Sequence, residues 1–258
     1  MNRRRLLLSS GALAVMPSLS HADVNADATR PLVALSGQHF RQNDQDYLLT
    51  DVAAPTAMAL GDGHVLVDEA RKALQSFLRG GVHELRPYGA IDRWGRQPVM
   101  PMVKSPLGNI KSIQRSMVEV GAVWVQPQTD QVSFIDDLIS HEEEARAEET
   151  GLWRFEDFRA RSALAASGAV GNYRLVQGRA VSVAIRRDYT YLNFGADYKT
   201  DFTATIRSSL ARKWLEHGID FASFEGEEVL IRGFVEWING PSIALKHRQQ
   251  IQLLPQTT

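Results

Sequence analysis

The stretch Asp92-Arg93-Trp94-Gly95-Arg96 lies between two segments that predict β-strands, Val82 to Pro87 and Gln97 to Lys104. Because glycine tolerates the positive φ of a tight turn, we expect a β-hairpin here. An arginine on a rigid hairpin can contact a phosphate through two hydrogen bonds, although a solvated turn whose arginines pair with surface carboxylates would have the same sequence. The candidate site residues are Arg96, for contact with a phosphate, and Arg93 and Trp94, for substrate binding.

The composition of the chain is typical of a globular protein. Its 258 residues are 44% hydrophobic and 23% charged, enough to bury a sizeable core in one large domain or two small ones. There is no cysteine, which excludes both a disulfide framework and a thiolate metal site.

The N-terminus has the features of an export signal. Arg3 to Arg5 are followed by a short apolar run, Leu6 to Met16, and by the small-x-small cleavage site Ser20-His21-Ala22. The run is shorter than the ~20 residues that a membrane span requires. Asn2 to Leu7 also resembles a twin-arginine signal. We therefore expect residues 1–22 to be removed and the mature chain, without a membrane span, to be periplasmic or secreted; a retained anchor is the alternative.

Removal of residues 1–22 would change the net charge from −1 to −4, because three arginines and no acid are lost. A nonspecific nucleic-acid binder normally carries a basic field, since phosphate neutralisation supplies most of its affinity. The charge therefore argues against strong nucleic-acid binding, while leaving room for a local basic groove.

Hydrophobic periodicity and turn residues predict a first unit that mixes strands and helices. Besides the hairpin, the expected strands are Leu32 to Leu35, Tyr47 to Val52 and Val123 to Val125. The expected helices, each followed by glycine, are Val67 to Leu78, Ile113 to Val120 and Phe134 to Thr150. In the third helix the i,i+4 pair Glu142/Arg146 predicts modest local support.

A second unit follows residues 155–172, which predict a linker helix and a Ser-Gly hinge. Its expected elements are strands Tyr173 to Ile185, Tyr189 to Phe194 and Phe202 to Ile206, helix Ser208 to His217, and strands Val229 to Trp237 and Ser242 to Lys246. Asn239-Gly240 predicts a hairpin between the last two strands. Three strands, a helix and two strands is the order of a five-stranded OB barrel.

Residues 32–154 resemble the staphylococcal (thermonuclease-type) nuclease family. The resemblance rests on the order of elements and on these motifs: Glu69-Ala70, Asp92 to Arg96, Val118 to Ala122, Leu138, Glu142, Ala145-Arg146 and Gly151 to Trp153. It implies a nuclease-type OB barrel with three packed helices, in an α+β, mainly β fold. Residues 173–254 resemble C-terminal modules found beside such domains, which implies a second small OB-like β-barrel; the matching motifs are Tyr191 to Gly195, Asp201 to Thr203 and Asn239 to Pro241.

The resemblance implies calcium-dependent phosphodiester hydrolysis, with two arginines on the phosphate, a glutamate on the attacking water and aspartates on the metal. Arg96 matches the second arginine of the family. The other positions depart from the family pattern: Ser36 to His39 replaces the first acidic loop, Leu48 the first arginine, Ala53 the metal aspartate and Thr56 the catalytic glutamate.

These departures predict the loss of metal catalysis. Calcium requires six to eight oxygen ligands, and neutral Gln38 and Ala53 cannot supply the charge. A general base and a charged clamp are each worth ~10²–10⁴ in rate. Asp51, Asp62 and Asp68 are the acids that could replace the missing family acids. Asp51 alternates with the core positions of its strand, so its side chain would face the site. We therefore assign no metal ligand and no cofactor, and expect calcium if the chain is active.

Two further patterns contain chemically active residue types. His141 to Ala145 resembles a zinc-binding His-Glu-x-x-His helix but has alanine at the second ligand position. The second unit has aromatic residues near Arg186 and Arg187 that would form a base-stacking face, as in OB domains that bind single strands; a core role is favoured for at least half of them. These are Tyr189, Tyr191, Phe194, Phe202 and Trp237.

Three functions are compatible with the sequence, and the fold alone does not choose between them. The first is an exported nuclease-like protein with a degenerate catalytic site that binds nucleic acid, weakly, or protein. The second is an active phosphodiester-hydrolysing nuclease with a rearranged metal site. The third is a structural partner in an envelope complex, bound through the acidic third helix or the C-terminal barrel.

Overall fold

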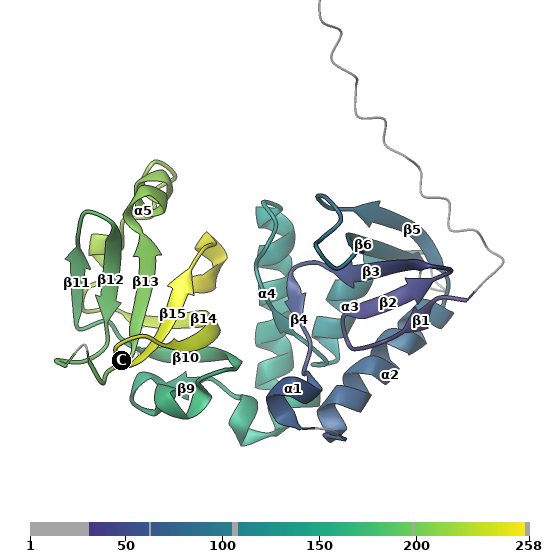
Figure 1. The fold of residues 1–258 in the computed structure, drawn as a ribbon, viewed down its shortest axis with the longest axis horizontal. Coiled ribbons are helices and arrows are strands. Elements are labelled where there is room, and N and C mark those ends of the chain that lie inside the picture. The colour runs from purple at the N-terminus through teal and green to yellow at the C-terminus, as the bar shows by residue number, and fades with distance from the viewer. Residues whose placement is uncertain (1–30, 62, 105–107, 198, 256–258) are drawn as a thin grey trace, which may run out of the picture.

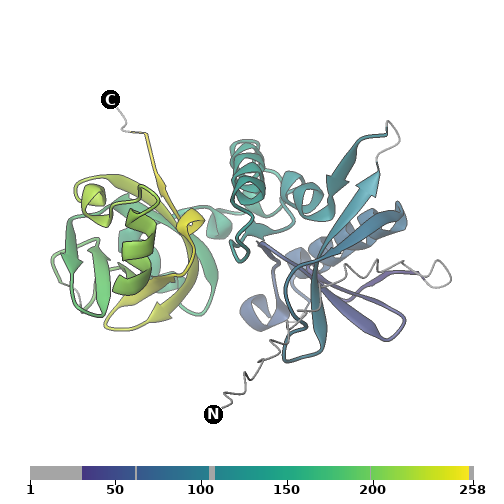
Figure 2. The same cartoon turned by 90° about the horizontal axis from the view of Figure 1, so that it is seen from above.

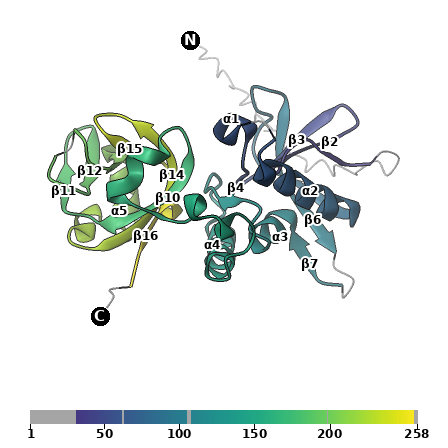
Figure 3. The ribbon, with the colours of Figure 1, turned by 90° about the horizontal axis from the view of Figure 1, so that it is seen from below.

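Two curled β-sheets, one from each half of the chain, lie on opposite sides of helix α4 (Val132–Ala147) in the computed structural model (Figure 1). The other two views agree (Figure 2, Figure 3). The structure describes residues 31–255 except 62, 105–107 and 198, so the export signal expected at residues 1–22 lies outside the described part. Within that part, no helix combines the length and apolar character needed to cross a bilayer.

The first sheet has the strand order β1-β2-β3-β6-β5, with β7 paired to β6. Strands β3 and β6 run parallel, and the other neighbours are antiparallel. Helix α2 (Val65–Arg79) has buried residues four apart in sequence, and two of them, Leu74 and Leu78, pack in one core cluster with residues of this sheet. The strands are β1 (Val33–Ala34), β2 (His39–Gln42), β3 (Gln45–Leu49), β5 (Val82–Pro87), β6 (Arg96–Lys104) and β7 (Ile110–Ser112).

Four short elements accompany this sheet in the first half. Helix α1 (Ala57–Leu60) precedes α2, and helix α3 (Ile113–Glu119) follows β7. Strands β4 (Val52–Ala53) and β8 (Trp124–Val125) form a separate antiparallel pair. This pair brings residues 52–53, which follow β3, against residues 124–125, which precede α4.

The second sheet has the order β11-β12-β13-β15-β14-β10-β9, with β16 paired to β14. As in the first sheet, the strand that precedes the helix pairs in parallel with the last long strand: β13 precedes α5 (Ser208–Leu215) and pairs with β15. Both sheets are therefore compatible with OB-like barrels. The strands are β9 (Arg161–Ser162), β10 (Tyr173–Arg179), β11 (Ser182–Ile185), β12 (Tyr189–Asn193), β13 (Thr203–Arg207), β14 (Glu228–Trp237), β15 (Pro241–Leu245) and β16 (Ile251–Leu253).

The structure confirms most predicted elements, including both hairpin strands, and corrects three of them. The strand expected over 47–52 is interrupted at Asp51, whose φ of 59° separates β3 from β4. The strand expected over 173–185 is split into β10 and β11. The linker helix expected within 155–172 is instead two 3₁₀ helices, η2 (Glu156–Phe158) and η3 (Ala163–Ala169), with β9 between them.

Gly121 and Gly151 belong to two of the quoted motifs, and the structure gives them a packing reason. Both have φ of 60°, and Leu152 N donates to Gly121 O at 2.8 Å. A Cβ on Gly121 would collide with the carbonyl oxygen of Thr150. The end of α3 therefore packs directly on the end of α4, and only glycine allows this approach.

A cluster of buried side chains joins the two halves of the molecule. Two other clusters lie within the first and the second half. The joining cluster takes its residues from β4, α2, β8, α4, β10 and β14, as well as from the turns that follow α4. Its members are Ala53, Leu66, Trp124, Ala145, Leu152, Trp153, Phe158, Tyr173, Leu175 and Leu230. We call this contact between the halves the seam.

An ion pair is buried inside the seam. Glu142 Oε2 lies 2.7 Å from Arg232 Nη1, and both side chains are 0% exposed. Glu142 Oε1 accepts from the Val125 amide at 2.7 Å, and Arg232 Nη2 donates to Gln252 Oε1 at 2.8 Å. The partner of Glu142 is thus in the second half, whereas Arg146, its expected i,i+4 partner, forms an ion pair with Glu143 at 3.9 Å.

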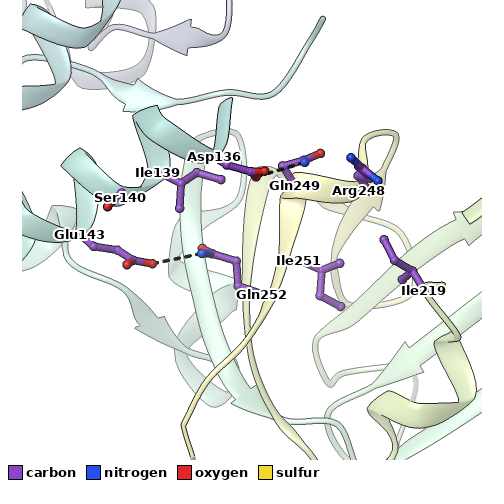
Figure 4. Close-up of a pocket in the computed structure, with 9 residues that line it drawn as sticks. All are labelled: Asp136, Ile139, Ser140, Glu143, Ile219, Arg248, Gln249, Ile251 and Gln252. Atoms are coloured by element: carbon purple, nitrogen blue, oxygen red, sulfur yellow. Dashed lines mark hydrogen bonds between the residues drawn. The ribbon is translucent and has the colours of Figure 1, made fainter. Parts of the chain in front are cut away.

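Weaker polar contacts lie at the outer edge of the seam (Figure 4). Asp136 and Glu143 of α4 accept hydrogen bonds at 3.1 Å from the side-chain amides of Gln249 and Gln252. These residues border a pocket of about 400 Å³ between α4, the 3₁₀ helix η5 (Arg248–Gln250) and β16. The Glu143–Gln252 contact is exposed and adds little to stability, whereas the Glu142–Arg232 pair is fully enclosed.

Replacing Glu142 with alanine should lower the free energy of unfolding by about 3–5 kcal/mol, because the Arg232 guanidinium would remain buried without a counter-charge. Denaturant unfolding monitored by circular dichroism measures this loss. The matched control is Glu143→Ala, which removes an exposed acid one residue away and should cost less than about 1 kcal/mol. Equal losses in the two variants would contradict the role of the buried pair.

Candidate functional site

The hairpin Asp92 to Arg96 is held by the carboxylate of Asp92. Its Oδ1 accepts from the amides of Trp94 at 2.9 Å and Arg96 at 3.0 Å. Its Oδ2 accepts from Arg96 Nε at 2.8 Å and lies 2.7 Å from Arg96 Nη2. Gly95 has φ of 78°, as the tight turn requires. Asp92 therefore fixes both the turn and the orientation of the Arg96 guanidinium.

Trp94 is 62% exposed and stacks against both candidate arginines. The Cζ of Arg93 lies 4.0 Å, and that of Arg96 4.7 Å, from its ring centroid. The structure thus brings Arg93, Trp94 and Arg96 together. A phosphate at Arg96 would have to compete with Asp92 for one edge of the guanidinium, whereas Arg93 forms no ion pair within the described residues.

Desolvation opposes ionisation of Asp92, but hydrogen bonds from the backbone and guanidinium of Arg96 and from the Trp94 amide outweigh it. The pKa of Asp92 is therefore lowered. A lowered folded-state pKa contributes stability that is complete above the unfolded value of about 3.9. This contribution is lost as the pH falls below that value, through the folded-state pKa.

The positions at which the resembled family has its acids come together in the structure, but as neutral residues. Gln38, Ala53 and Thr56 line one pocket of about 100 Å³. Gln38 Oε1 accepts from the Ala54 amide at 2.6 Å, which ties the first loop to the segment after β4. The second half contributes the opposite wall of this pocket: Asn172, Tyr173, Arg174 and Phe234. We call it the seam pocket.

Asp51 does not face the seam pocket, contrary to the expectation from its strand. Its side chain is buried and accepts from the amides of Gln128 at 2.8 Å and Thr129 at 2.9 Å, and from Thr129 Oγ1 at 2.8 Å. The positive φ of Asp51 turns the side chain toward this loop, a reversal that strand alternation cannot reveal. Asp51 therefore holds the 126–131 segment in place.

The remaining acids also have other partners or lie elsewhere. Asp68 pairs with Arg71 and Lys72 on α2, and Asp62 lies outside the described residues. His141 contacts Asp137 and Glu144 of its own helix. Across the part of the chain that the structure describes, no three histidines or acids are grouped closely enough to hold a metal ion.

A larger groove of about 570 Å³ runs across the second sheet on β12, β13 and β15. Tyr189 and Tyr191 have ring centroids 6.3 Å apart, and the Arg207 Cζ lies 5.4 Å from the Tyr189 ring. Short side chains of the middle strands leave the surface open: Thr203, Thr205, Ser242 and Ala244. Lys246, Glu236, Ile238 and Asn239 border the groove.

Of the five aromatic residues considered for a face of the second barrel, Tyr189 and Tyr191 line the groove. Phe194 and Phe202 are core residues, and Trp237 is 59% exposed. Tyr189 and Tyr191 line the groove because alternate residues of β12 face away from the core, a pattern visible in Tyr-Thr-Tyr-Leu. Sequence reasoning missed Arg207, which faces Tyr189 across the pairing of β12 with β13.

No family model and no curated protein matches this chain.

Replacing Arg96 with glutamine should raise the pKa of Asp92 toward its ordinary value, because the guanidinium contacts that favour the carboxylate are lost. A carboxyl-detected NMR titration of Asp92 measures the midpoint, which should lie below about 3.9 in the wild type. Arg93→Gln is the matched control, since Arg93 contacts Trp94 rather than Asp92, and it should give a smaller change. An unchanged Asp92 midpoint in Arg96→Gln would contradict this account of the hairpin.

Proposed function

We propose that this chain is an exported nuclease-like protein with a degenerate catalytic site, and that it binds single-stranded nucleic acid without cutting it. In this proposal, residues 32–154 are a nuclease-type OB domain that serves as a scaffold. Residues 173–254 are an OB-like domain that carries the binding groove, and residues 155–172 link the two. The groove with Tyr189, Tyr191 and Arg207 is the observation that carries the proposal.

The absence of cleavage is supported by the chemistry of the seam pocket. Gln38, Ala53 and Thr56 are neutral, so this pocket lacks the carboxylate charge that calcium requires. Asp51, the nearest acid along the chain, is hydrogen-bonded to the loop at Gln128 and Thr129. Arg96 would then be the remainder of a phosphate site without its metal or its general base.

Nucleic-acid binding is supported by the aromatic rings of the groove and by its two cations, Arg207 and Lys246, which outnumber the one acid, Glu236. Neither Arg207 nor Lys246 forms an ion pair within the described residues, so both are free to contact phosphate. Stacking of a base on an aromatic side chain is worth about 1–3 kcal/mol and tolerates any sequence. The groove crosses three neighbouring strands, which offers contact positions to successive nucleotides.

The distribution of charge favours the second half as the binding unit. Residues 173–254 contain eleven arginines and lysines and nine acids, a net charge of +2, whereas the chain from Asp23 onward carries −4. Like-charge repulsion from the first half weakens the attraction of a polyanion. The expected binding is therefore modest and falls steeply with added salt.

Fluorescence anisotropy with labelled single-stranded DNA and RNA tests the groove. Replacing both Tyr189 and Tyr191 with alanine should weaken binding by about 10-fold or more, because two stacking surfaces are removed. Arg207→Gln should weaken binding and reduce the slope of log K against log salt by about 1, the loss of one phosphate contact. Trp94→Ala, an exposed aromatic on the first sheet, is the matched control and should leave affinity unchanged.

The same protein incubated with each nucleic acid in calcium and in chelator should give no cleavage. Chelator-sensitive cleavage that Arg96→Ala abolishes would instead establish the active nuclease with a rearranged site. Binding that is lost in Trp94→Ala but kept in the tyrosine variant would place the site on the hairpin. No binding of DNA or RNA would overturn the proposal in favour of an envelope-protein partner.

A further inference from the structure

The seam pocket contains two buried N–H donors that have no acceptor. Trp124 Nε1 and Arg174 Nε are both enclosed and make no hydrogen bond to any described residue, and both residues line the pocket. The same lining holds one buried acceptor without a described donor, Asn172 Oδ1. Buried donors are almost always paired, since a missing hydrogen bond costs roughly 1–3 kcal/mol. Two such donors in one small pocket point to an acceptor that binds there.

Arg174 also lacks a counter-charge. The residue is 6% exposed, and its guanidinium makes one hydrogen bond, from Nη1 to the Tyr173 carbonyl at 2.8 Å. Among the described residues no carboxylate lies within ion-pair distance of it. Its Cζ lies 4.8 Å from the Phe158 ring centroid and 5.5 Å from that of Trp124. The aromatic faces offset part of the cost of burying this cation, but they satisfy none of its N–H groups.

Arg174 keeps its charge at neutral pH. Burial, helped by the nearby charge of Arg161, lowers the pKa of Arg174 to about 10. The seam pocket is therefore electropositive at the positions where the resembled family holds a cation between carboxylates. Neutral Gln38, Ala53 and Thr56 remove the negative charge, and Arg174 of the second half adds a positive one.

We propose that the seam pocket binds a small oxyanion, a carboxylate or phosphate, which accepts hydrogen bonds from Trp124 Nε1–H and the Arg174 guanidinium. The pocket of about 100 Å³ holds roughly the volume of three waters, which suits an ion of four or five heavy atoms and excludes a nucleotide. A hydrogen bond between ionised partners is about twice as strong as a neutral one, and Arg174 offers such a bond. The site uses none of the residues of the groove, so it stands apart from nucleic-acid binding.

Thermal unfolding of the full chain from Asp23 tests the proposal, with sodium acetate or sodium phosphate compared with sodium chloride at equal ionic strength and pH 7. Either oxyanion, near saturation, should raise Tm by about 3–5 °C above chloride. The larger of the two responses identifies the ligand class. Arg174→Gln should abolish the rise. The control Arg207→Gln removes an exposed arginine of the groove and should keep the response.

A second measurement keeps the test decisive if Arg174→Gln does not fold. In the wild type, the indole N–H signal of Trp124 in a ¹⁵N NMR spectrum should shift on addition of the oxyanion, while those of Trp94 and Trp237 stay in place. Trp124→Phe keeps an aromatic ring but removes the N–H donor. This change should weaken binding of the oxyanion by about 10-fold. The proposal is overturned if neither oxyanion exceeds chloride, if Arg174→Gln responds like the wild type, or if the Trp124 signal does not move.

Discussion

The buried ion pair between Glu142 and Arg232 is the interaction on which the arrangement of the two halves depends. Two fully enclosed charges are tolerated only when each is paired and hydrogen-bonded. Here Glu142 is held by the Val125 amide and Arg232 by Gln252, so α4, β8, β14 and β16 must meet in one geometry. The apolar residues of the seam supply most of the burial energy, and the ion pair selects which packing is allowed.

That geometry determines the surroundings of Gln38, Ala53 and Thr56. The β4–β8 pair lies against β10 and β14, and Tyr173 Oη donates to the Val125 carbonyl at 2.8 Å. The pocket lined by Gln38, Ala53 and Thr56 therefore has a wall from the second half. The groove on β12, β13 and β15, by contrast, shares no lining residue with this pocket. The pocket is therefore enclosed between the two halves, whereas the groove lies on the second half alone.

Local sequence signals predicted the elements that depend on interactions between residues close together in the sequence. The hairpin follows from Gly95 between two strand segments, and α2 and α4 follow from apolar spacing and terminal glycines. The seam could not be predicted in this way. Glu142 and Arg232 are 90 positions apart, and an i,i+4 rule assigned Glu142 to Arg146 instead. The prediction that Asp51 faces the site was wrong for a related reason. The positive φ of Asp51 turns its side chain away from the face that strand alternation assigns to it.

The candidate site residues show the same difference between contacts that are local in the sequence and contacts that are not. Arg93, Trp94 and Arg96 were found because they share one turn, and the turn itself brings them together. Arg174 and Trp124 lie on different halves and have no motif, so only their packing reveals two unpaired donors in one pocket. The residues of the first half that line the pocket, among them Gln38, Ala53 and Thr56, are all neutral. Arg174 of the second half is the residue that gives the pocket a positive charge, so in the proposed site the same seam would disfavour a cation and favour an anion.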